Sequence, residues 1–418
     1  MDDARIAWKI REQMAVFSGN VSQGLPKVSQ RLVREVLYGV QARGSVLLSE
    51  IGRSLGEATS LKKIIERLGR QLERSGLRQQ VRENLLTLAA PRITADTLLV
   101  VDPTDLSKRY ARSMEYLARV RDGSEGKLAD GYWCLEVVAV QRGTAQVIPL
   151  YQELYSQEAP DFLSENQEIL GAIEAVSQAA GGRGIWVMDR GGDREELLKP
   201  LLESGKSFLI RQRGDRHLIW RRKAQAVEAI AERCRRPYRQ TIVKQTGEEE
   251  KIYDLRFGAT PVRFPGVDRP LMLVVVEGLG RRPLMLLTTL PVRRSYKSVW
   301  RVVESYLARW RVEETIRFIK QSYQLEDIRL LLYERLRTMV TLVMAVAYFA
   351  AVHLGKQAKL AVFALHLLRA AQRIYGVPEF RLYALADGIK QVLFSSRRGI
   401  GPPPPLLEPG ILLLPLEA

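Results

Sequence analysis

Cysteine and histidine are scarce in this chain of 418 residues, which has two cysteines and three histidines. Cys134 and Cys234 lie far apart and in no Cys-x-x-Cys pair, which excludes a disulfide framework and a zinc finger. The histidines are scattered, which argues against a His-rich metal site or a Ser-His-Asp triad. Any metal ion must therefore be held by carboxylates, and these favour a hard ion such as Mg²⁺ or Mn²⁺.

A phosphate-binding loop is also missing. The run Gly205-Lys206-Ser207 resembles the end of such a loop, but Pro200 stands where its first glycine belongs. No convincing Gly-x-Gly-x-x-Gly follows a predicted strand. These absences disfavour a nucleotide hydrolase and a Rossmann enzyme, so we expect no nucleotide cofactor.

A secretory signal and a clear membrane span are lacking as well. The N-terminal segment 1–14 is charged throughout and has no apolar core. The longest uncharged run, between Arg337 and Lys356, only approaches the length of a membrane span and contains polar residues. We interpret it as a buried helix, with a membrane span as the alternative. Together with the unpaired cysteines, this predicts a cytoplasmic protein without a membrane partner.

Positive charge is what the sequence has in excess. The chain has 64 Lys and Arg against 47 Asp and Glu, a formal net charge of +17. Such a surplus points to a polyanionic partner, nucleic acid first and an acidic membrane surface second. Because 46% of the residues are hydrophobic and 27% are charged, the chain is expected to be globular rather than disordered.

The first 95 residues are predicted to be helical and basic. Apolar residues recur at helical spacing in two short segments, 45–56 and 61–74, and Ser60 is the expected N-cap of the second. The second segment carries four cations away from its apolar face: Lys62, Lys63, Arg67 and Arg70. Two short helices joined by a tight turn indicate a helix-turn-helix-like DNA contact, with an ordinary helical bundle as the alternative. We therefore assign 1–95 as a helical DNA-binding domain.

The rest of the chain is predicted to have a mixed α/β order. Strands are expected at 97–101, 132–141, 145–150, 184–188 and 208–211, and helices at 162–180 and 193–204. Asp193 and Glu196 are the expected capping pair of the second helix. We divide this part into an α/β core (96–215 and 291–330), a β-rich insertion (216–290), a helical C-terminal region (331–395) and a proline-rich tail (396–418).

Two aspartates follow predicted buried strands. Asp102 comes directly after 98–101, and Asp189 comes directly after 185–188. A carboxylate at the end of a buried strand is well placed to hold a metal ion at a sheet edge. Each aspartate alone is also typical of a turn, and Asp-Pro is itself a turn signal.

A helix predicted around Glu313 carries four polar or amphipathic groups on one face. At about 100° per residue, these four fall within about 60° of one another: Tyr306, Arg309, Glu313 and Lys320. Such a face presents a carboxylate to a metal ion, two cations to phosphates and a phenol hydroxyl to a backbone oxygen. A solvated face with an ordinary Glu-to-Lys pattern is the alternative.

These residues resemble the signature of a known family. The spacing from Tyr306 to Lys320 resembles the Y-R-E-K signature of DDE transposases from bacterial cut-and-paste insertion sequences. The sequences around Asp102 (DPTD) and Asp189 (DRGGD) resemble the first two acidic motifs of that family. The run LLTTLPV at 286–292 resembles the segment that precedes the glutamate, and the resemblance covers about 95–355.

The resemblance implies a ribonuclease-H-like core, a mixed sheet flanked by helices. Three carboxylates would hold two divalent ions, Mg²⁺ or in its place Mn²⁺, for phosphodiester chemistry: Asp102, Asp189 and Glu313. Three further signature residues would contact the transposon end: Tyr306, Arg309 and Lys320. Arg190 is a candidate phosphate contact, with helix capping or a salt bridge as its alternative.

One position departs from the family pattern. Some members carry a tryptophan just before the strand that ends in the two threonines, and it stacks on a base flipped out of the DNA end. This chain has Leu284 at that place. Trp300 and Tyr296 are the candidates to stack in its stead.

The implied function is that of a transposase. It would bind the terminal inverted repeats as double-stranded DNA, cut at their ends and join the 3′-hydroxyl ends to target DNA, as a homodimer on paired ends. The apolar helices between Arg337 and Gly376 are expected to supply part of the dimer contact. A bacterial, cytoplasmic and nucleoid-associated location follows. The alternative is a catalytically silent relative that only binds DNA ends.

Overall fold

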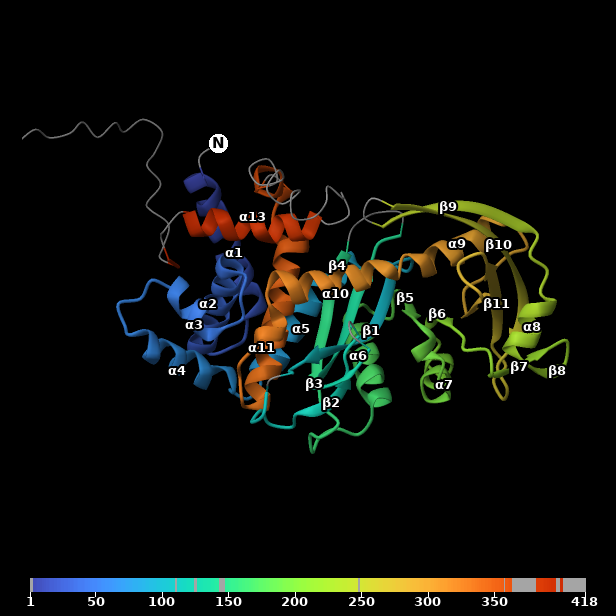
Figure 1. Cartoon of the computed structure of the whole chain (residues 1–418), viewed down its shortest axis with the longest axis horizontal. Helices are drawn as coiled ribbons and strands as arrows, with labels where there is room; N and C mark the ends of the chain where they lie inside the picture. Colours follow the sequence, from blue (N-terminus) through green and yellow to red (C-terminus); the bar gives the residue numbers. More distant parts are fainter. Residues whose placement is uncertain are drawn as a thin grey trace, which may run out of the picture.

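A computed structural model gives the fold for residues 3–109, 111–123, 126–142, 147–246, 249–356, 358–362, 381–395 and 399–400. A long mixed sheet extends from a helical body that contains both the N-terminal and the C-terminal helices (Figure 1). The predicted fold class is confirmed: a mixed α/β sheet is flanked by helices, with helical regions at both ends. The proline-rich tail predicted at 396–418 lies outside the described residues except for 399–400.

The core of the sheet is built from six strands. They are β1 (Leu98–Ser107), β2 (Ala118–Arg121), β3 (Leu128–Val140), β4 (Val147–Tyr155), β5 (Ile185–Met188) and β6 (Ser207–Arg211). Strand β3 pairs antiparallel with β1, β2 and β4, whereas β5 pairs parallel with β1 and β6. The order β4-β3-β1-β5-β6, antiparallel on one side of β1 and parallel on the other, is the arrangement expected of a ribonuclease-H-like sheet.

The predicted β-rich insertion continues this sheet. It contains β7 (His217–Trp220), β8 (Lys223–Ala226), α8 (Val227–Arg233), β9 (Tyr238–Thr246), β10 (Glu249–Arg263), β11 (Pro270–Glu277) and β12 (Leu284–Thr288). Strand β12 pairs with β6 on one side and with β11 on the other. The insertion therefore extends the edge of the core sheet, and β9 and β10 form a long hairpin at its far end (Figure 1).

Helices cover both faces of the core sheet. Alternate residues of β1 enter two cores, as expected for a strand buried on both faces. Leu99 and Val101 pack with α6 (Glu165–Ala179) and α7 (Glu195–Glu203), whereas Leu98 and Val100 pack with α9 (Tyr296–Leu307) and α10 (Trp310–Ser322). The side chain at position 102 thus points to the face that α9 and α10 cover.

The predicted cap of α7 is wrong. The N-cap residue is Arg194, and its side chain makes no capping hydrogen bond. Asp193 instead accepts from the backbone N–H of Arg213 at 2.8 Å and pairs with Arg216 at 2.5 Å. A buried carboxylate gains more from a guanidinium than from one backbone N–H, so the tertiary contact replaces the cap.

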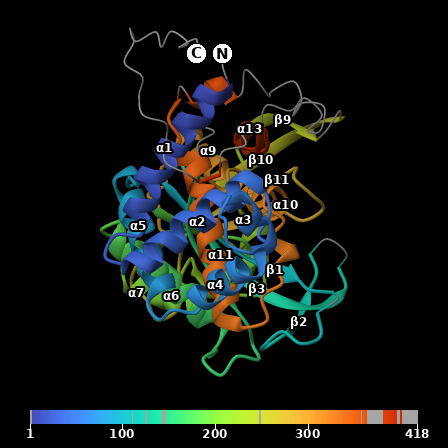
Figure 2. The same ribbon diagram turned by 90° about the vertical axis from the view of Figure 1, so that its left-hand side faces the viewer.

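The N-terminal and C-terminal helices share one core. The former are α1 (Asp3–Val21), α2 (Lys27–Arg43), α3 (Leu48–Ser54), α4 (Leu61–Leu72) and α5 (Leu77–Ala89), and the latter include α11 (Tyr333–Tyr348) and α13 (Arg381–Ser395). Helices α2, α4 and α5 pack against α11, and α2 and α4 can be followed beside it in Figure 2. The apolar segment Tyr333–His353 is long enough to cross a membrane, but 83% of its most apolar 18-residue stretch is buried inside the fold. It is a core helix, as interpreted from the sequence.

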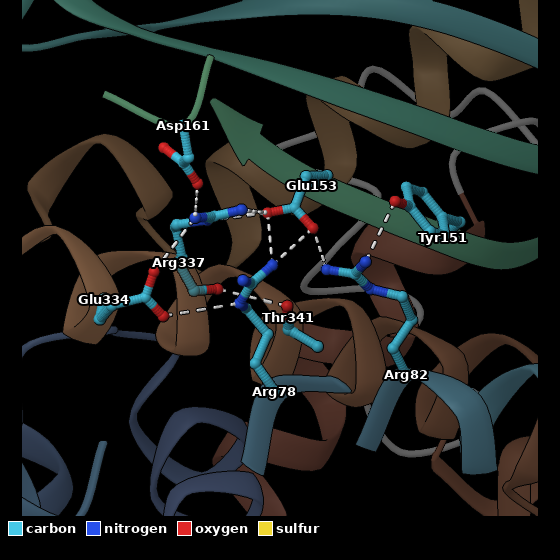
Figure 3. A network of polar contacts seen from close by, with 8 residues as sticks. All are labelled: Arg78, Arg82, Tyr151, Glu153, Asp161, Glu334, Arg337 and Thr341. Atoms are coloured by element: carbon cyan, nitrogen blue, oxygen red, sulfur yellow. Dashed lines mark hydrogen bonds and ion pairs between the residues drawn. The ribbon is translucent and has the colours of Figure 1, made fainter. Parts of the chain in front are cut away.

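A network of buried charges joins these helices to the sheet (Figure 3). We call it the Glu153 clasp; it consists of Glu153 on β4, Arg78 and Arg82 on α5, and Arg337 on α11. Arg78 approaches the two carboxylate oxygens at 2.6 and 2.7 Å, Arg337 Nε donates at 2.9 Å, and Arg82 also pairs with Glu153. Three cations thus converge on one carboxylate that is only 4% exposed.

Candidate active site

Asp102 and Asp189 lie level with each other on neighbouring strands. The parallel pair of β1 and β5 has Val100 opposite Val187, and two residues further along both strands the register reaches Asp102 and Asp189. Asp189 follows the last residue of β5, as predicted, and accepts from the backbone N–H of Gly191 at 2.6 Å. The two aspartates therefore meet at the same edge of the parallel part of the sheet.

The predicted end of the first strand is wrong. Strand β1 continues through Asp102 to Ser107, so Asp102 neither ends a strand nor begins a turn. The cause is β3, which pairs with every residue of β1 from Leu98 to Ser107. This long ladder outweighs the local turn preference of Asp-Pro.

The signature residues lie on two helices, not on the single helix that was predicted. Helix α9 ends at Leu307 and α10 begins at Trp310, with Arg309 between them. The backbone N–H of Arg309 bonds to the carbonyl of Tyr306 at 3.0 Å, a tight turn that breaks the regular i to i−4 pattern. The shared face survives this break because Arg309 still contacts residues on both sides of it.

Arg309 connects two of the three predicted carboxylates. Its Nη2 donates to Glu313 Oε1 at 2.7 Å, and its Nη1 lies 3.8 Å from Asp102 Oδ2. The guanidinium is also 5.9 Å from the ring centre of Tyr306. Because the Arg309 side chain is only 10% exposed, this cation sits within the site rather than in solvent.

The environment of Asp102 disfavours its charged form. Burial is the largest cause and raises the pKa of Asp102 to about 7, with Asp189 and Glu313 adding to the rise. Arg309 opposes the rise but does not cancel it. A carboxylate with this balance has a strong affinity for further positive charge.

Tyr306 and Lys320 lie at the two ends of the signature. The hydroxyl of Tyr306 is buried and has no hydrogen-bond partner among the described residues. Lys320 donates to the backbone carbonyl of Asp105, and its Nζ lies 3.8 Å from Asp105 Oδ1 and 3.6 Å from Glu326 Oε1. Lys320 lines a pocket of about 600 Å³ that also contains Asp102 and Glu313.

A second pocket, of about 480 Å³, opens beside Asp189 and was missed from the sequence. Its charged lining residues are Asp189, Arg190, Arg211, Arg213 and Arg282. Arg190 is exposed at its rim, where it was predicted to contact phosphate. The two arginines of Arg211-Gln-Arg213, one at the end of a buried strand and one just beyond it, were the signal available in the sequence.

The other predicted DNA contacts lie away from the carboxylates. Lys62, Lys63 and Arg70 are exposed on α4, so they remain candidates for DNA contact. Arg67 is instead paired with Glu35 at 2.8 Å and with Glu57 at 2.7 Å.

Trp300 lies on α9 within an aromatic cluster. Its ring centre is 5.5 Å from that of Phe257 and 6.5 Å from that of Tyr296. It stands nine residues before Arg309 along the helix pair, roughly 13 Å at a helical rise, and is not brought to the carboxylates.

The carboxylates suit a divalent cation in their chemistry, although they do not form a closed site. Asp102, Asp189 and Glu313 provide the oxygen ligands that Mg²⁺ prefers, and their mutual repulsion at Asp102 would be relieved by a cation. In the described part of the chain no three acidic, His or Cys side chains already form a metal-binding group. The Arg309 guanidinium, which bridges Asp102 and Glu313, would have to turn away for these ligands to close around an ion.

Comparison with known proteins supports the predicted class. Residues 165–349 match the family model described as "Transposase DDE domain", a segment that contains Asp189 and the whole Tyr306–Lys320 signature but begins after Asp102. No curated protein matches the chain. Among solved structures, the chain is similar to a piggyBac transposase synaptic complex with hairpin DNA, at 13% identity and a TM-score of 0.43, over 93% of this chain and 84% of the other. The family match supports a DDE transposase, a class that generally uses divalent metal ions.

Proposed function

We propose that this protein is a cut-and-paste transposase of a bacterial insertion sequence. It binds the terminal inverted repeats, cuts the DNA at the transposon ends and joins the 3′-hydroxyl ends to target DNA. The single observation that carries this proposal is the carboxylate arrangement: Arg309 bridges Asp102 and Glu313, and Asp189 lies next to Asp102 on the neighbouring strand. Asp189 and Glu313 fall within the segment that matches a transposase DDE domain.

Each residue of the site has a proposed role. Asp102, Asp189 and Glu313 hold divalent ions, for which we propose two Mg²⁺ per site, with Mn²⁺ able to substitute. In phosphodiester chemistry such ions activate the attacking oxygen and stabilise the leaving oxygen. Arg309 neutralises Asp102 and Glu313, and it would turn to a phosphate of the DNA end where ions took its place.

The remaining contacts orient the DNA. Lys320 lines the pocket that contains Asp102 and Glu313, Arg190 lines the arginine-lined pocket beside Asp189, and each binds a phosphate of the DNA there. The buried hydroxyl of Tyr306 donates to a backbone phosphate near the scissile bond. We propose that the protein acts as a homodimer on paired ends, in the bacterial cytoplasm at the nucleoid.

Cleavage and strand transfer on DNA that carries the element's own terminal repeats test this proposal. Wild-type protein is expected to nick and join these ends only when Mg²⁺ or Mn²⁺ is present. Asp189→Asn and Glu313→Gln are expected to abolish both reactions while end binding persists. Glu304→Gln, an exposed carboxylate on α9, is the matched control and keeps full activity.

Two results would contradict the proposal. Wild-type cleavage by Asp189→Asn or Glu313→Gln would remove these residues from the active site. End-specific binding by the wild type without any metal-dependent nicking would assign the protein to the catalytically silent, end-binding class instead.

A further inference from the structure

A row of polar side chains crosses the core sheet at the level of Asp102. In the β1–β3 ladder Asp102 is directly opposite Glu136, and in the β3–β4 ladder Glu136 is directly opposite Gln152. Directly paired residues of an antiparallel ladder point to the same face of a sheet. Asp189 continues this row on the other side of Asp102, at the end of β5.

Glu136 and Gln152 are buried behind the candidate site. Glu136 is 0% exposed and Gln152 is 1% exposed. Gln152 Nε2 donates to Glu136 Oε1 at 2.7 Å, whereas Glu136 Oε2 and Gln152 Oε1 have no hydrogen-bond partner among the described residues. Helix α10, which carries Glu313 and Lys320, packs against β3 and β4 and covers this row of side chains.

A carboxylate at this position is costly for the fold alone. The neighbours of Glu136 along β3 are Leu135, Val137 and Val138, all fully buried, so an apolar residue would suit the packing better. Like charges directly opposite each other across a ladder are also unfavourable. Stability therefore does not explain why a glutamate occupies position 136. The charged group directly opposite Glu136 in the β1–β3 ladder is Asp102.

The electrostatic surroundings connect Glu136 to the same residues. Burial raises the pKa of Glu136 to about 7, the cation of Lys320 and the hydrogen bond from Gln152 oppose this rise, and Asp102 adds to it. Glu136 thus interacts with a carboxylate and a cation of the proposed site without lining either of its pockets.

We propose that Glu136, oriented by Gln152, is a positioning residue for Asp102. Its carboxylate stands beside Asp102 on the β3 side and repels the Asp102 carboxylate away from β3. The Asp102 oxygens are then directed toward Arg309 and the pocket that Asp102 lines with Glu313, which is where a divalent cation would be held. The inference rests on the proposed function, because it concerns the cation site of that function.

Titration of the metal alone into the full-length protein tests the proposal, with Mg²⁺ followed by calorimetry and Mn²⁺ by its electron paramagnetic resonance. Glu136→Gln keeps the shape and a hydrogen bond to Gln152 but removes the repulsion, and it is expected to weaken binding about tenfold to a hundredfold, as for other outer residues of metal sites. Glu136→Asp keeps the charge and is expected to restore most of the affinity. Asp102→Asn is expected to lose more affinity than either.

Unchanged affinity in Glu136→Gln, while Asp102→Asn loses binding, would overturn this inference and leave the proposed function intact. Unchanged affinity in both variants, or no binding by the wild type, would overturn the inference and the proposed cation site together. If Glu136→Gln does not fold, Gln152→Leu replaces it: it removes the orienting amide, is expected to weaken binding severalfold, and overturns the inference if the affinity stays at the wild-type value. Glu304→Gln is the control for a general change of charge.

Discussion

Two carboxylates in the same half of the sheet, Glu153 at 4% exposed and Asp102 at 20% exposed, have opposite electrostatic surroundings. Burial alone would raise the pKa of Glu153, but Arg82, Arg78 and Arg337 outweigh burial and lower it. Asp102 has one arginine at 3.8 Å and two further carboxylates nearby, and its pKa rises to about 7. The two pKa values shift in opposite directions because Glu153 has three arginine partners and Asp102 has one. Burial does not explain the difference, because both side chains are largely enclosed.

This difference separates a structural carboxylate from one suited to binding a ligand. In the Glu153 clasp the charges are more than balanced inside the fold, so the carboxylate has no affinity left for an external cation. At Asp102 the negative charge exceeds the positive charge nearby, so an added cation would be stabilising. Charge balance around a buried group therefore indicates its role better than burial does.

The largest expected effect is the loss of chemistry on neutralising Asp102. Asp102→Asn is expected to lower the DNA cleavage rate on the order of 10³-fold or more, because it removes several kcal/mol of transition-state stabilisation. Its thermal stability in a chelator is expected to equal or exceed that of the wild type, since an unfavourable buried charge is gone. Single-turnover cleavage measures the expected loss of rate, and a thermal melt measures the expected stability. A melting temperature well below the wild type would show that Asp102 is structural, like Glu153.

Neutralising Glu153 is expected to have the reverse outcome. Glu153→Gln leaves three half-buried guanidinium groups without their shared buried partner, and the free energy of unfolding is expected to fall by about 3–5 kcal/mol. Denaturant unfolding measures this loss. Glu334→Gln is the control. The Glu334 side chain lies at the edge of the same network and is 54% exposed, so this variant is expected to change the free energy of unfolding by only about 0–1 kcal/mol. Equal effects in both variants would contradict the clasp.

The pH dependence of stability sharpens the contrast further. In the folded protein the pKa of Asp102 is raised from about 4 to about 7, so the folded state binds this proton more tightly than the unfolded state does. The stabilisation that this bound proton gives to the folded state is fully present below about pH 4, and it is lost as the pH rises through 7. Between pH 5 and 8 the metal-free wild type is expected to lose on the order of 2 kcal/mol of unfolding free energy through Asp102. Asp102→Asn is expected not to show this loss. Identical curves for the variant and the wild type would contradict it.

For Glu153 the sign is the opposite. Its pKa is lowered, so its contribution is present above its ordinary pKa and is lost as the pH falls through the lowered value. Stability at acidic pH therefore tests the Glu153 clasp, and stability near neutral pH tests Asp102.

The smallest effect concerns the cations of α4, where the same contrast applies. Lys62 and Lys63 are exposed, whereas Arg67 is paired with Glu35 and Glu57. The double change of Lys62 and Lys63 to Glu is expected to weaken end binding and to reduce the slope of log affinity against log salt by about 0.9 per lost phosphate contact. Arg67→Gln is expected to lower stability more than affinity. Unchanged salt dependence in the lysine variant would return α4 to a structural role.

The sequence predicted those features that depend on local pattern. Apolar runs located β1, β5 and β6, and the spacing of Tyr306, Arg309 and Glu313 placed them on one face. The pattern could not reveal that β3 extends β1 past Asp102, because that depends on a partner strand some 30 residues away. It could not reveal the break at Arg309, because a tight turn leaves helical spacing almost unchanged.

The sequence proposes the members of the candidate site but does not reveal what surrounds them. Asp102, Asp189 and Glu313 were chosen for their chemistry and their resemblance to known motifs. Glu136 was visible as a single acidic residue in an apolar strand, yet its relation to Asp102 is a matter of register between two strands. The pairing of Arg67 and the contacts of Asp193 likewise come from segments distant in the chain.

The core shared by the N-terminal helices and α11 has a consequence for how the chain is synthesised. Helices α2, α4 and α5 bury their apolar faces against α11, which begins at Tyr333. On a ribosome that adds 5–20 residues per second, some 240 residues must follow α5 before α11 is made, a delay of roughly 10–50 seconds. During that time the first helices lack their central partner, so the basic N-terminal part of a nascent chain is expected to reach its final shape only after α11 has been made.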